Sequence, residues 1–454
     1  MISAIRHVLG FGRRSVHNLS TEARAGLFGL GWSYLSHGVQ LVLRLGSSLI
    51  LTRLLAPDAY GIFGPALAVI FLLDMLCDLG VQQSVIRSPI GETPEFLGTA
   101  RSLLLVRAIP LTLAVAALAF VLPPFYDLPE LFGVLLVLSV RPLLLSQLNP
   151  TLFVLYRHLN YRTPFRLDVL QLLFSIPMTI VLAWQLPSEW SVWSLVIGLL
   201  FGDAVRVVLS HILCPRVPGF RWDAPSAREL SRFGFSILRN TIVYGAWIYF
   251  DRLAGPRLLG PEKIGLYVLA WTLAEGLELL ISRGSDVFYS MLARRDEADR
   301  TPFFQRTARR VALYLLPLLF VGAMLAPLVF KLIYPAKFHG SAVLLGLLIV
   351  RLIMRATSQI QFMHLMMRAE VYIATRAYIA SFIVLVATFV VWVEVLGLGV
   401  VGLAVSAVVA MTTFTLTQTL QLVWRKELSP WPAIAGLLWT GVGMAGVLLV
   451  YGTG

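Results

Sequence analysis

The chain has 454 residues, of which 58% are hydrophobic and only 13% are charged. Soluble globular domains carry about 25% charged residues, so this composition excludes a chain that faces water on all sides. The formal net charge is +13, but the basic residues are dispersed between apolar stretches, which excludes a single basic patch for binding nucleic acid.

The chain opens with an amphipathic, arginine-containing lead, residues 1–24, which lacks the apolar run and cleavage site of a signal peptide. We expect this lead to stay at the cytoplasmic surface. Apolar stretches of roughly 20 residues then recur, each long enough to cross a bilayer as a helix. We predict an all-α polytopic membrane protein with thirteen spans, at residues 26–52, 60–86, 98–123, 129–156, 167–186, 190–214, 233–256, 262–290, 304–334, 339–367, 371–395, 397–424 and 431–451.

The distribution of lysine and arginine predicts how these spans are oriented. With the N-terminus assigned to the cytoplasm, basic residues in the cytoplasmic loops far outnumber those in the periplasmic loops. This is the bias described by the positive-inside rule, and a missed or extra span would destroy it. We therefore expect a multi-pass protein of the bacterial inner membrane with its N-terminus in the cytoplasm.

The sequence also repeats itself. Residues 53–63 resemble residues 257–267 at an offset of 204, and the same offset relates Asp74 to Glu278. Val140-Arg141 matches Val350-Arg351 at an offset of 210. Each pair is six spans apart, so the halves share one orientation, a parallel repeat in which substrate binds between the halves. We predict an N-lobe at residues 25–215, a C-lobe at 216–425 and an extra C-terminal helix at 426–454.

Ionisable residues inside the spans are the candidate functional groups, because charge at bilayer depth is costly and usually faces a cavity or a partner. In the first span, polar residues recur at helical spacing, which predicts one polar face on a water-filled cavity. The predicted cavity residues are Arg44, Arg141, Arg351, Arg355, Arg107, Arg239, Gln40 and His37. We expect Asp74 and Glu278 near the cavity or the contact between lobes, with ion coupling as an alternative role.

A structural role for these arginines stays open at this point. Each could pair with an acid on a neighbouring helix and hold the bundle together. The intramembrane acids available for this are Asp74, Asp78, Asp203, Glu275, Glu278 and Asp286. Asp203 and Arg206 lie three residues apart on one predicted helix, so we expect them to pair with each other.

The sequence contains no metal-ligand cluster, no phosphate-binding glycine loop and no nucleophile motif in a supporting context. We therefore expect neither an enzyme nor a bound cofactor.

Two long runs carry a family resemblance. The run from Leu51 to Arg87 resembles the opening helices of Wzx-type polysaccharide-transporter flippases, and the run from Asp251 to Arg294 is similar to their seventh and eighth helices. The segment from Leu155 to Arg162 resembles, loosely, their basic loop after helix four. These proteins belong to the multidrug/oligosaccharidyl-lipid/polysaccharide exporter superfamily, whose members usually have twelve or fourteen spans, so the resemblance does not account for a thirteenth.

The resemblance implies a V-shaped, two-lobed fold that moves a lipid-linked oligosaccharide across the inner membrane by alternating access, for surface or exopolysaccharide synthesis. The expected carrier is undecaprenyl pyrophosphate, whose phosphates suit the planar fork of arginine. The implied partners are this glycolipid, membrane lipids and other polysaccharide-assembly proteins.

Two other functions remain as alternatives. The first is an ion-coupled drug or metabolite exporter of the same superfamily. A cationic-drug exporter would use acids in its cavity, whereas the first span offers Arg44 and no acid, which favours an anionic substrate. The second is a membrane-embedded glycan polymerase or ligase, which typically needs a sizeable periplasmic loop that the predicted spans do not leave.

Overall fold

The computed structural model describes residues 21–78, 80–158, 160–214, 219–293, 295–368 and 370–451. Most of the predicted lead, residues 1–20, lies outside this part. The described residues form helices and turns without any strand, and ten of their helical segments are long and apolar enough to cross a membrane. The chain is therefore an all-helical, multi-pass membrane protein, as predicted.

The helix at the first predicted span, residues 26–52, is not among these ten segments. The second predicted span, residues 60–86, is divided into two helices at Gly80, whose φ is 59°. The fourth, residues 129–156, is divided as well. There Pro142 and Pro150, which lack an amide hydrogen for the helical ladder, accompany two interruptions, and three short helices replace one long one. The helices of this half are α3 (Thr21–Leu54), α4 (Pro57–Leu76), α5 (Val81–Arg87), α6 (Pro94–Tyr126), α7 (Glu130–Leu138), α8 (Arg141–Leu145), α9 (Thr151–Arg157), α10 (Arg162–Gln185) and α11 (Ser191–Leu213).

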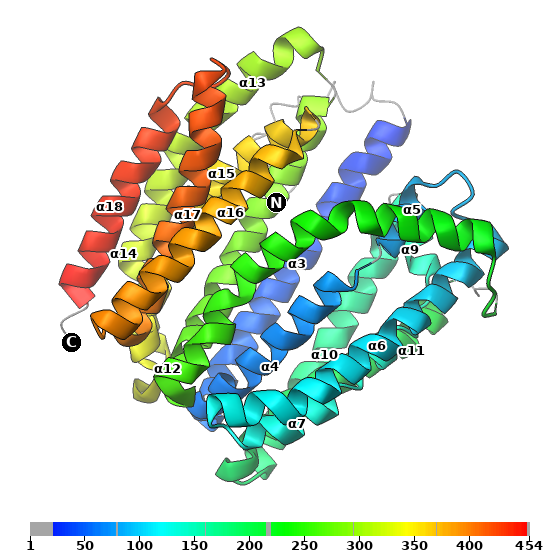
Figure 1. Ribbon diagram of the computed structural model, residues 1–454, viewed down its shortest axis with the longest axis horizontal. Coiled ribbons are helices and arrows are strands. Elements are labelled where there is room, and N and C mark those ends of the chain that lie inside the picture. Colours follow the sequence, from blue (N-terminus) through cyan, green and yellow to red (C-terminus); the bar gives the residue numbers. More distant parts are fainter. Residues whose placement is uncertain are drawn as a thin grey trace.

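The second half begins with α12 (Ala224–Ala293), which contains the predicted seventh and eighth spans. Gly260, at φ 75° and ψ 167°, leaves the helical conformation and divides α12 into two helical segments. This positive φ favours glycine, which has no Cβ atom. The helices that follow are α13 (Glu297–Arg310), α14 (Leu316–Ile333), α15 (Gly340–Met367), α16 (Val371–Phe389), α17 (Gly399–Trp424) and α18 (Trp431–Tyr451). Figure 1 shows α13–α18 gathered on one side and α4–α11 on the other, with α12 running between them.

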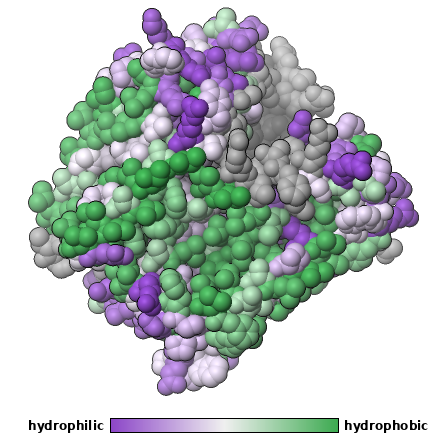
Figure 2. Space-filling view, in the orientation of Figure 1, coloured by the Kyte–Doolittle hydropathy of each residue, from purple (hydrophilic) through white to green (hydrophobic). Residues whose placement is uncertain are grey.

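The surface is that of a protein in lipid. Large apolar side chains such as Leu318, Leu332 and Trp424 are 66%, 84% and 86% exposed. Figure 2 shows hydrophobic residues over the middle of one face and hydrophilic residues at two opposite margins. Such an extended apolar surface is rare on soluble monomers, and it matches the hydrocarbon layer of a bilayer.

The repeated turns meet each other where α4 packs against α12. A Cβ atom added to Gly61 would lie 1.8 Å from the carbonyl oxygen of Pro261, and one added to Gly265 would lie 1.9 Å from that of Pro57. Gly61 and Gly265 are equivalent in the repeat, as are Pro57 and Pro261. Reciprocal contact between equivalent residues is what two halves related by a two-fold axis make, and glycine is required because the backbones touch.

Further contacts join the halves at the same end. Arg257 Nη1 donates to the carbonyl oxygen of Phe125 at 2.7 Å and lies 3.1 Å from Asp127 Oδ2. Lys337 Nζ, on the other half, donates to the carbonyl oxygen of Arg53 at 3.3 Å. The two halves are therefore held together at the end of the molecule where α3, α6 and α14 terminate.

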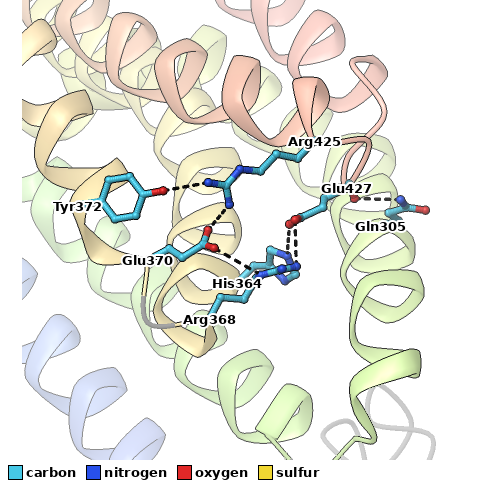
Figure 3. A network of polar contacts seen from close by, with 7 residues as sticks. All are labelled: Gln305, His364, Arg368, Glu370, Tyr372, Arg425 and Glu427. Atoms are coloured by element: carbon cyan, nitrogen blue, oxygen red, sulfur yellow. Dashed lines mark hydrogen bonds and ion pairs between the residues drawn. The ribbon is translucent and has the colours of Figure 1, made fainter.

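The thirteenth predicted span is present as α18, and a polar network fixes the loop that precedes it (Figure 3). Glu427 Oε1 accepts from Arg368 Nη1 at 2.9 Å, and its Oε2 lies 3.0 Å from Nε2 of the buried His364. Gln305 Nε2 of α13 donates to the Glu427 carbonyl oxygen at 2.9 Å. Arg425 binds Glu370 at the start of α16. The network ties α13, α15, α16 and α17 together beside α18.

Candidate functional site: a polar cavity in the first half

A cavity of about 580 Å³ opens between α3, α4, α6, α8, α10 and α11. Its volume lies within the range of small-molecule sites, about 300–1,000 Å³. Of the residues predicted to line a cavity, the structure places Arg44, Arg107, Arg141 and Gln40 here. Asp74, predicted near the cavity, also lines it.

The ionised groups on this wall balance one another. Four arginines, Arg44, Arg107, Arg141 and Arg206, face four aspartates, Asp74, Asp78, Asp168 and Asp203. The cavity therefore carries no net formal charge, although the sequence pointed to an excess of arginine. Whether the cavity can bind an anion therefore depends on which of its arginines are already paired with aspartates.

Arg141 and Asp203 form the most enclosed pair. Arg141 Nε donates to Asp203 Oδ2 at 2.7 Å, with the side chains 12% and 3% exposed. Gln171 Nε2 donates to the other oxygen of Asp203 at 3.0 Å, and Arg206 Nη2 lies 3.2 Å from Asp168 Oδ1. Asp203 thus pairs with an arginine of α8, and the predicted pairing of Asp203 with Arg206 is wrong. An ion pair this enclosed joins α8 to α11, so Arg141 is already engaged by a carboxylate.

Arg107 is paired in a more open setting. Its Nη2 lies 2.5 Å from Asp74 Oδ1 and its Nη1 lies 3.4 Å from Asp78 Oδ1. The two carboxylates are 43% and 50% exposed. Ion pairs exposed to this degree contribute about 0–1 kcal/mol, so an anionic ligand can compete with the aspartates for this guanidinium.

Arg44 is the cavity arginine without a carboxylate. No other described residue forms a hydrogen bond or ion pair with its exposed guanidinium. Gln40, one turn away on α3, donates its Nε2 to Ser36 Oγ at 2.9 Å. The free cation of the cavity wall is therefore on α3, where the sequence predicted a polar face.

The equivalent region of the second half is closed. Glu278 accepts from Arg351 Nη2 at 2.5 Å and from Arg355 Nε at 2.7 Å, and Arg351 is only 3% exposed. The Arg351 guanidinium also lies 4.5 Å from the ring centroid of Trp271. The cavity that Arg351 lines here measures about 20 Å³, room for about one water molecule. The structure thus does not place Arg351 and Arg355 on the wall of the large cavity.

The remaining predicted residues are distributed differently. His37 lines a small crevice of about 40 Å³ between α3 and α12, which shares Gln40 and Arg44 with the polar cavity. The side chain of Arg239 lies outside the described part of the chain. Sequence reasoning did not consider Asp168 and Gln171, although their spacing of three residues places them on one face of α10. Within the described residues, no group of three or more His, Cys, Asp or Glu could hold a metal ion.

Comparisons with known proteins agree with this architecture. Residues 50–343 match the family described as "Polysaccharide biosynthesis protein". The chain is 26% identical over 245 residues to the succinoglycan biosynthesis transport protein ExoT of Rhizobium meliloti (strain 1021), covering 53% of this chain and 48% of that one. It is 23% identical to the lipopolysaccharide biosynthesis protein WzxC of Escherichia coli (strain K12), covering 54% and 50%. Each match spans about half the length of the relative.

Among solved structures, the fold resembles that of the lipid II flippase MurJ in an inward closed conformation. The TM-score is 0.70 at 12% identity, with 94% of this chain and 93% of MurJ covered. The two-lobed transporter fold implied by the sequence resemblance is thereby confirmed.

Proposed function

The chain belongs to the polysaccharide biosynthesis protein family, and from this premise we propose that it moves a lipid-linked oligosaccharide from the cytoplasmic to the periplasmic leaflet of the bacterial inner membrane. The observation that carries the proposal is the polar cavity inside a multi-pass helical protein, on whose wall Arg44 has no partner among the described residues. The similarity to ExoT and WzxC, transport and lipopolysaccharide biosynthesis proteins by name, supports the same class of substrate.

We propose that the cavity binds the anionic phosphates of the carrier. Arg44 offers a free guanidinium, and Arg107 can exchange Asp74 and Asp78 for a phosphate. Arginine binds phosphate oxygens in a bidentate geometry, with stronger hydrogen bonds than neutral donors make. Arg141 and Arg206 shape the wall, and Gln40 contributes a polar side chain. Arg351, Arg355 and Glu278 hold the second half closed, and His37 and Arg239 remain candidates for other steps of the cycle.

Alternating access would use residues 25–215 and 216–425 as two lobes that meet where α4 packs on α12 and part there when the cavity opens to the periplasm. With the N-terminus in the cytoplasm, the end at which the lobes touch is periplasmic, and Asp127 and Glu189 lie in periplasmic loops. An impermeant thiol reagent should then label cysteines introduced at 127 and 189 in intact cells, but not one introduced at 296. Labelling at 296 would reverse the proposed orientation.

The proposed substrate site is tested by Arg44→Ala. No described side chain depends on Arg44 as a partner, so we expect normal membrane abundance together with loss of glycan export. Arg44→Lys should restore export in part, because it keeps the charge and loses the planar fork. Arg306→Ala, which removes an exposed arginine of α13, is the matched control. Normal export by the Arg44→Ala protein would contradict the site.

Lipid extraction from the deletion strain identifies the carrier-linked glycan that accumulates.

One observation favours a second function, the ion-coupled exporter. Asp74 and Asp78 are half exposed in the cavity and are bound by the single side chain of Arg107, so a cation could occupy them when Arg107 turns to an anion. If coupling uses these acids, Asp74→Asn should remove the dependence of transport on the ion gradient while leaving substrate binding in place.

A further inference from the structure

A second depression lies beside the polar cavity, between α3 and α10. It measures about 290 Å³ and is lined mainly by apolar side chains, among them Val42 and Ile50 of α3 and Leu172, Leu173 and Ile176 of α10. Ser47 contributes a hydroxyl, but its Oγ donates to the carbonyl oxygen of Arg44 at 2.9 Å, within the helix. We call this surface the α3–α10 groove.

The groove faces outward from the bundle. Val42 is 69% exposed, Leu173 48% and Ile50 44%, although each is apolar. Gly46 also lines the groove, and a Cβ atom added there would have no neighbour within 4 Å. Because α10 is long and apolar enough to cross a membrane, the exposed apolar residues of the groove face the hydrocarbon of the bilayer.

The groove and the polar cavity adjoin each other. Leu172 lines both, and Gln171, the residue before it, faces the cavity. On α3, Arg44 lines the cavity while Val42 and Gly46 line the groove. A molecule with an anionic head at Arg44 would therefore find an apolar channel within about one helical turn, 5.4 Å, of the charge it binds.

We propose that the α3–α10 groove holds the first isoprene units of the carrier's polyprenyl chain while the pyrophosphate lies at Arg44. This inference rests on the proposed function and assigns the lipid half of the same substrate. An amphiphile whose head enters a polar cavity must leave its tail in hydrocarbon, and this groove offers such a path beside the unpaired cation. Because lipid tails are as apolar as leucine, the groove contributes room and van der Waals contact more than transfer from water.

The groove can be closed by one substitution. The phenyl ring of Gly46→Phe would occupy the groove without an initial clash, since nothing lies within 4 Å of the added Cβ. Gly441→Phe is the matched control, because Gly441 is an exposed glycine of α18 with the same open surroundings, far from the groove in the chain. The full chain in lipid nanodiscs is titrated with two probes, inorganic pyrophosphate for the head site and a long-chain polyprenyl pyrophosphate for head and tail together.

We expect Gly46→Phe to weaken binding of the long-chain probe about tenfold, a difference of about 1.4 kcal/mol, and to leave pyrophosphate binding unchanged. Arg44→Ala should weaken both probes, and Gly441→Phe neither. Equal weakening of both probes by Gly46→Phe would overturn the groove assignment, as would no change for either. If a bilayer phospholipid fills the groove, the long-chain probe is insensitive to Gly46→Phe, and the proposal fails. Failure of the wild-type protein to bind either probe would instead refute the proposed function.

Discussion

At the scale of single residues, Arg44 and Arg141 show that a position inside a predicted span does not determine whether an arginine is paired. Both lie inside predicted spans, and sequence position alone gave them the same role. The structure separates them, because Asp203 accepts from Arg141 in a nearly closed setting, whereas Arg44 meets no described carboxylate. The partner lies 62 residues away on another helix, so no local pattern reveals the pair. Composition and helical spacing predicted four of the cavity side chains but also placed Arg351 and Arg355 there, and they did not show which groups are free to bind.

This difference predicts opposite results for the two alanine variants. Arg141→Ala leaves Asp203, 3% exposed, without its cation, and breaking a buried pair in this way costs about 3–5 kcal/mol. We expect membrane abundance of the Arg141→Ala protein to fall sharply, unlike that of the Arg44→Ala protein. Adding Asp203→Asn should restore abundance, because the uncompensated charge is then removed while an acceptor for Gln171 remains. Normal abundance of Arg141→Ala alone would show that this pair does not hold the bundle together.

At the scale of helices, hydropathy predicted most spans, because a backbone in lipid has few alternatives to a helix. It failed at residues 60–86, which divide into α4 and α5 at Gly80. It also failed at residues 129–156, where Pro142 and Pro150 break the run into α7, α8 and α9. This failure matters for the site, because Arg141 and Pro142 at the start of α8 line the cavity. The prolines were visible in the sequence, but transmembrane helices often tolerate proline, so only tertiary packing decides between a kink and an interruption.

At this scale we predict that Glu427 anchors the loop before α18. Glu427→Gln removes the charge that binds Arg368 and faces the buried His364 (Figure 3). We expect the midpoint of thermal unfolding of the purified protein to fall, because the free energy of unfolding decreases by about 1–3 kcal/mol. Tyr372→Phe is the control, because it deletes one hydrogen bond, which Arg425 Nη2 donates to the exposed hydroxyl of Tyr372. Equal effects of the two variants would mean that Glu427 does not anchor the loop.

At the scale of the whole molecule, equivalent residues of the repeat lie at the contact between the two halves. The sequence match between residues 53–63 and 257–267 gave no contact between these turns, yet the structure packs them on each other. The residues that match across the repeat, glycine and proline, are those the close approach needs. The ion pairs do not follow the repeat, since Asp74 binds Arg107 while Glu278 binds Arg351 and Arg355. One half is thus open where the other is packed, an asymmetry that equivalent residues alone cannot predict.

The reciprocal contact makes a prediction about the transport cycle. A methyl group at Gly61 would meet the Pro261 carbonyl oxygen at 1.8 Å, and one at Gly265 would meet that of Pro57 at 1.9 Å. Backbone atoms cannot move aside cheaply, so either alanine must push α4 and α12 apart at this end. If the lobes part here when the cavity opens to the periplasm, Gly61→Ala and Gly265→Ala should each favour that state, and to a similar extent.

The measurement is labelling of a cysteine introduced at Gln171, inside the cavity, in a background where Cys77 and Cys214 are replaced by alanine. An impermeant thiol reagent outside intact cells should label this cysteine several-fold faster in both glycine variants. Gly322→Ala on α14, where an added Cβ meets nothing within 4 Å, should leave the rate unchanged. An increase in only one glycine variant would mean that the two glycines do not contribute equally to closing this end of the protein. Unchanged labelling in both variants would mean that the lobes do not separate at this contact.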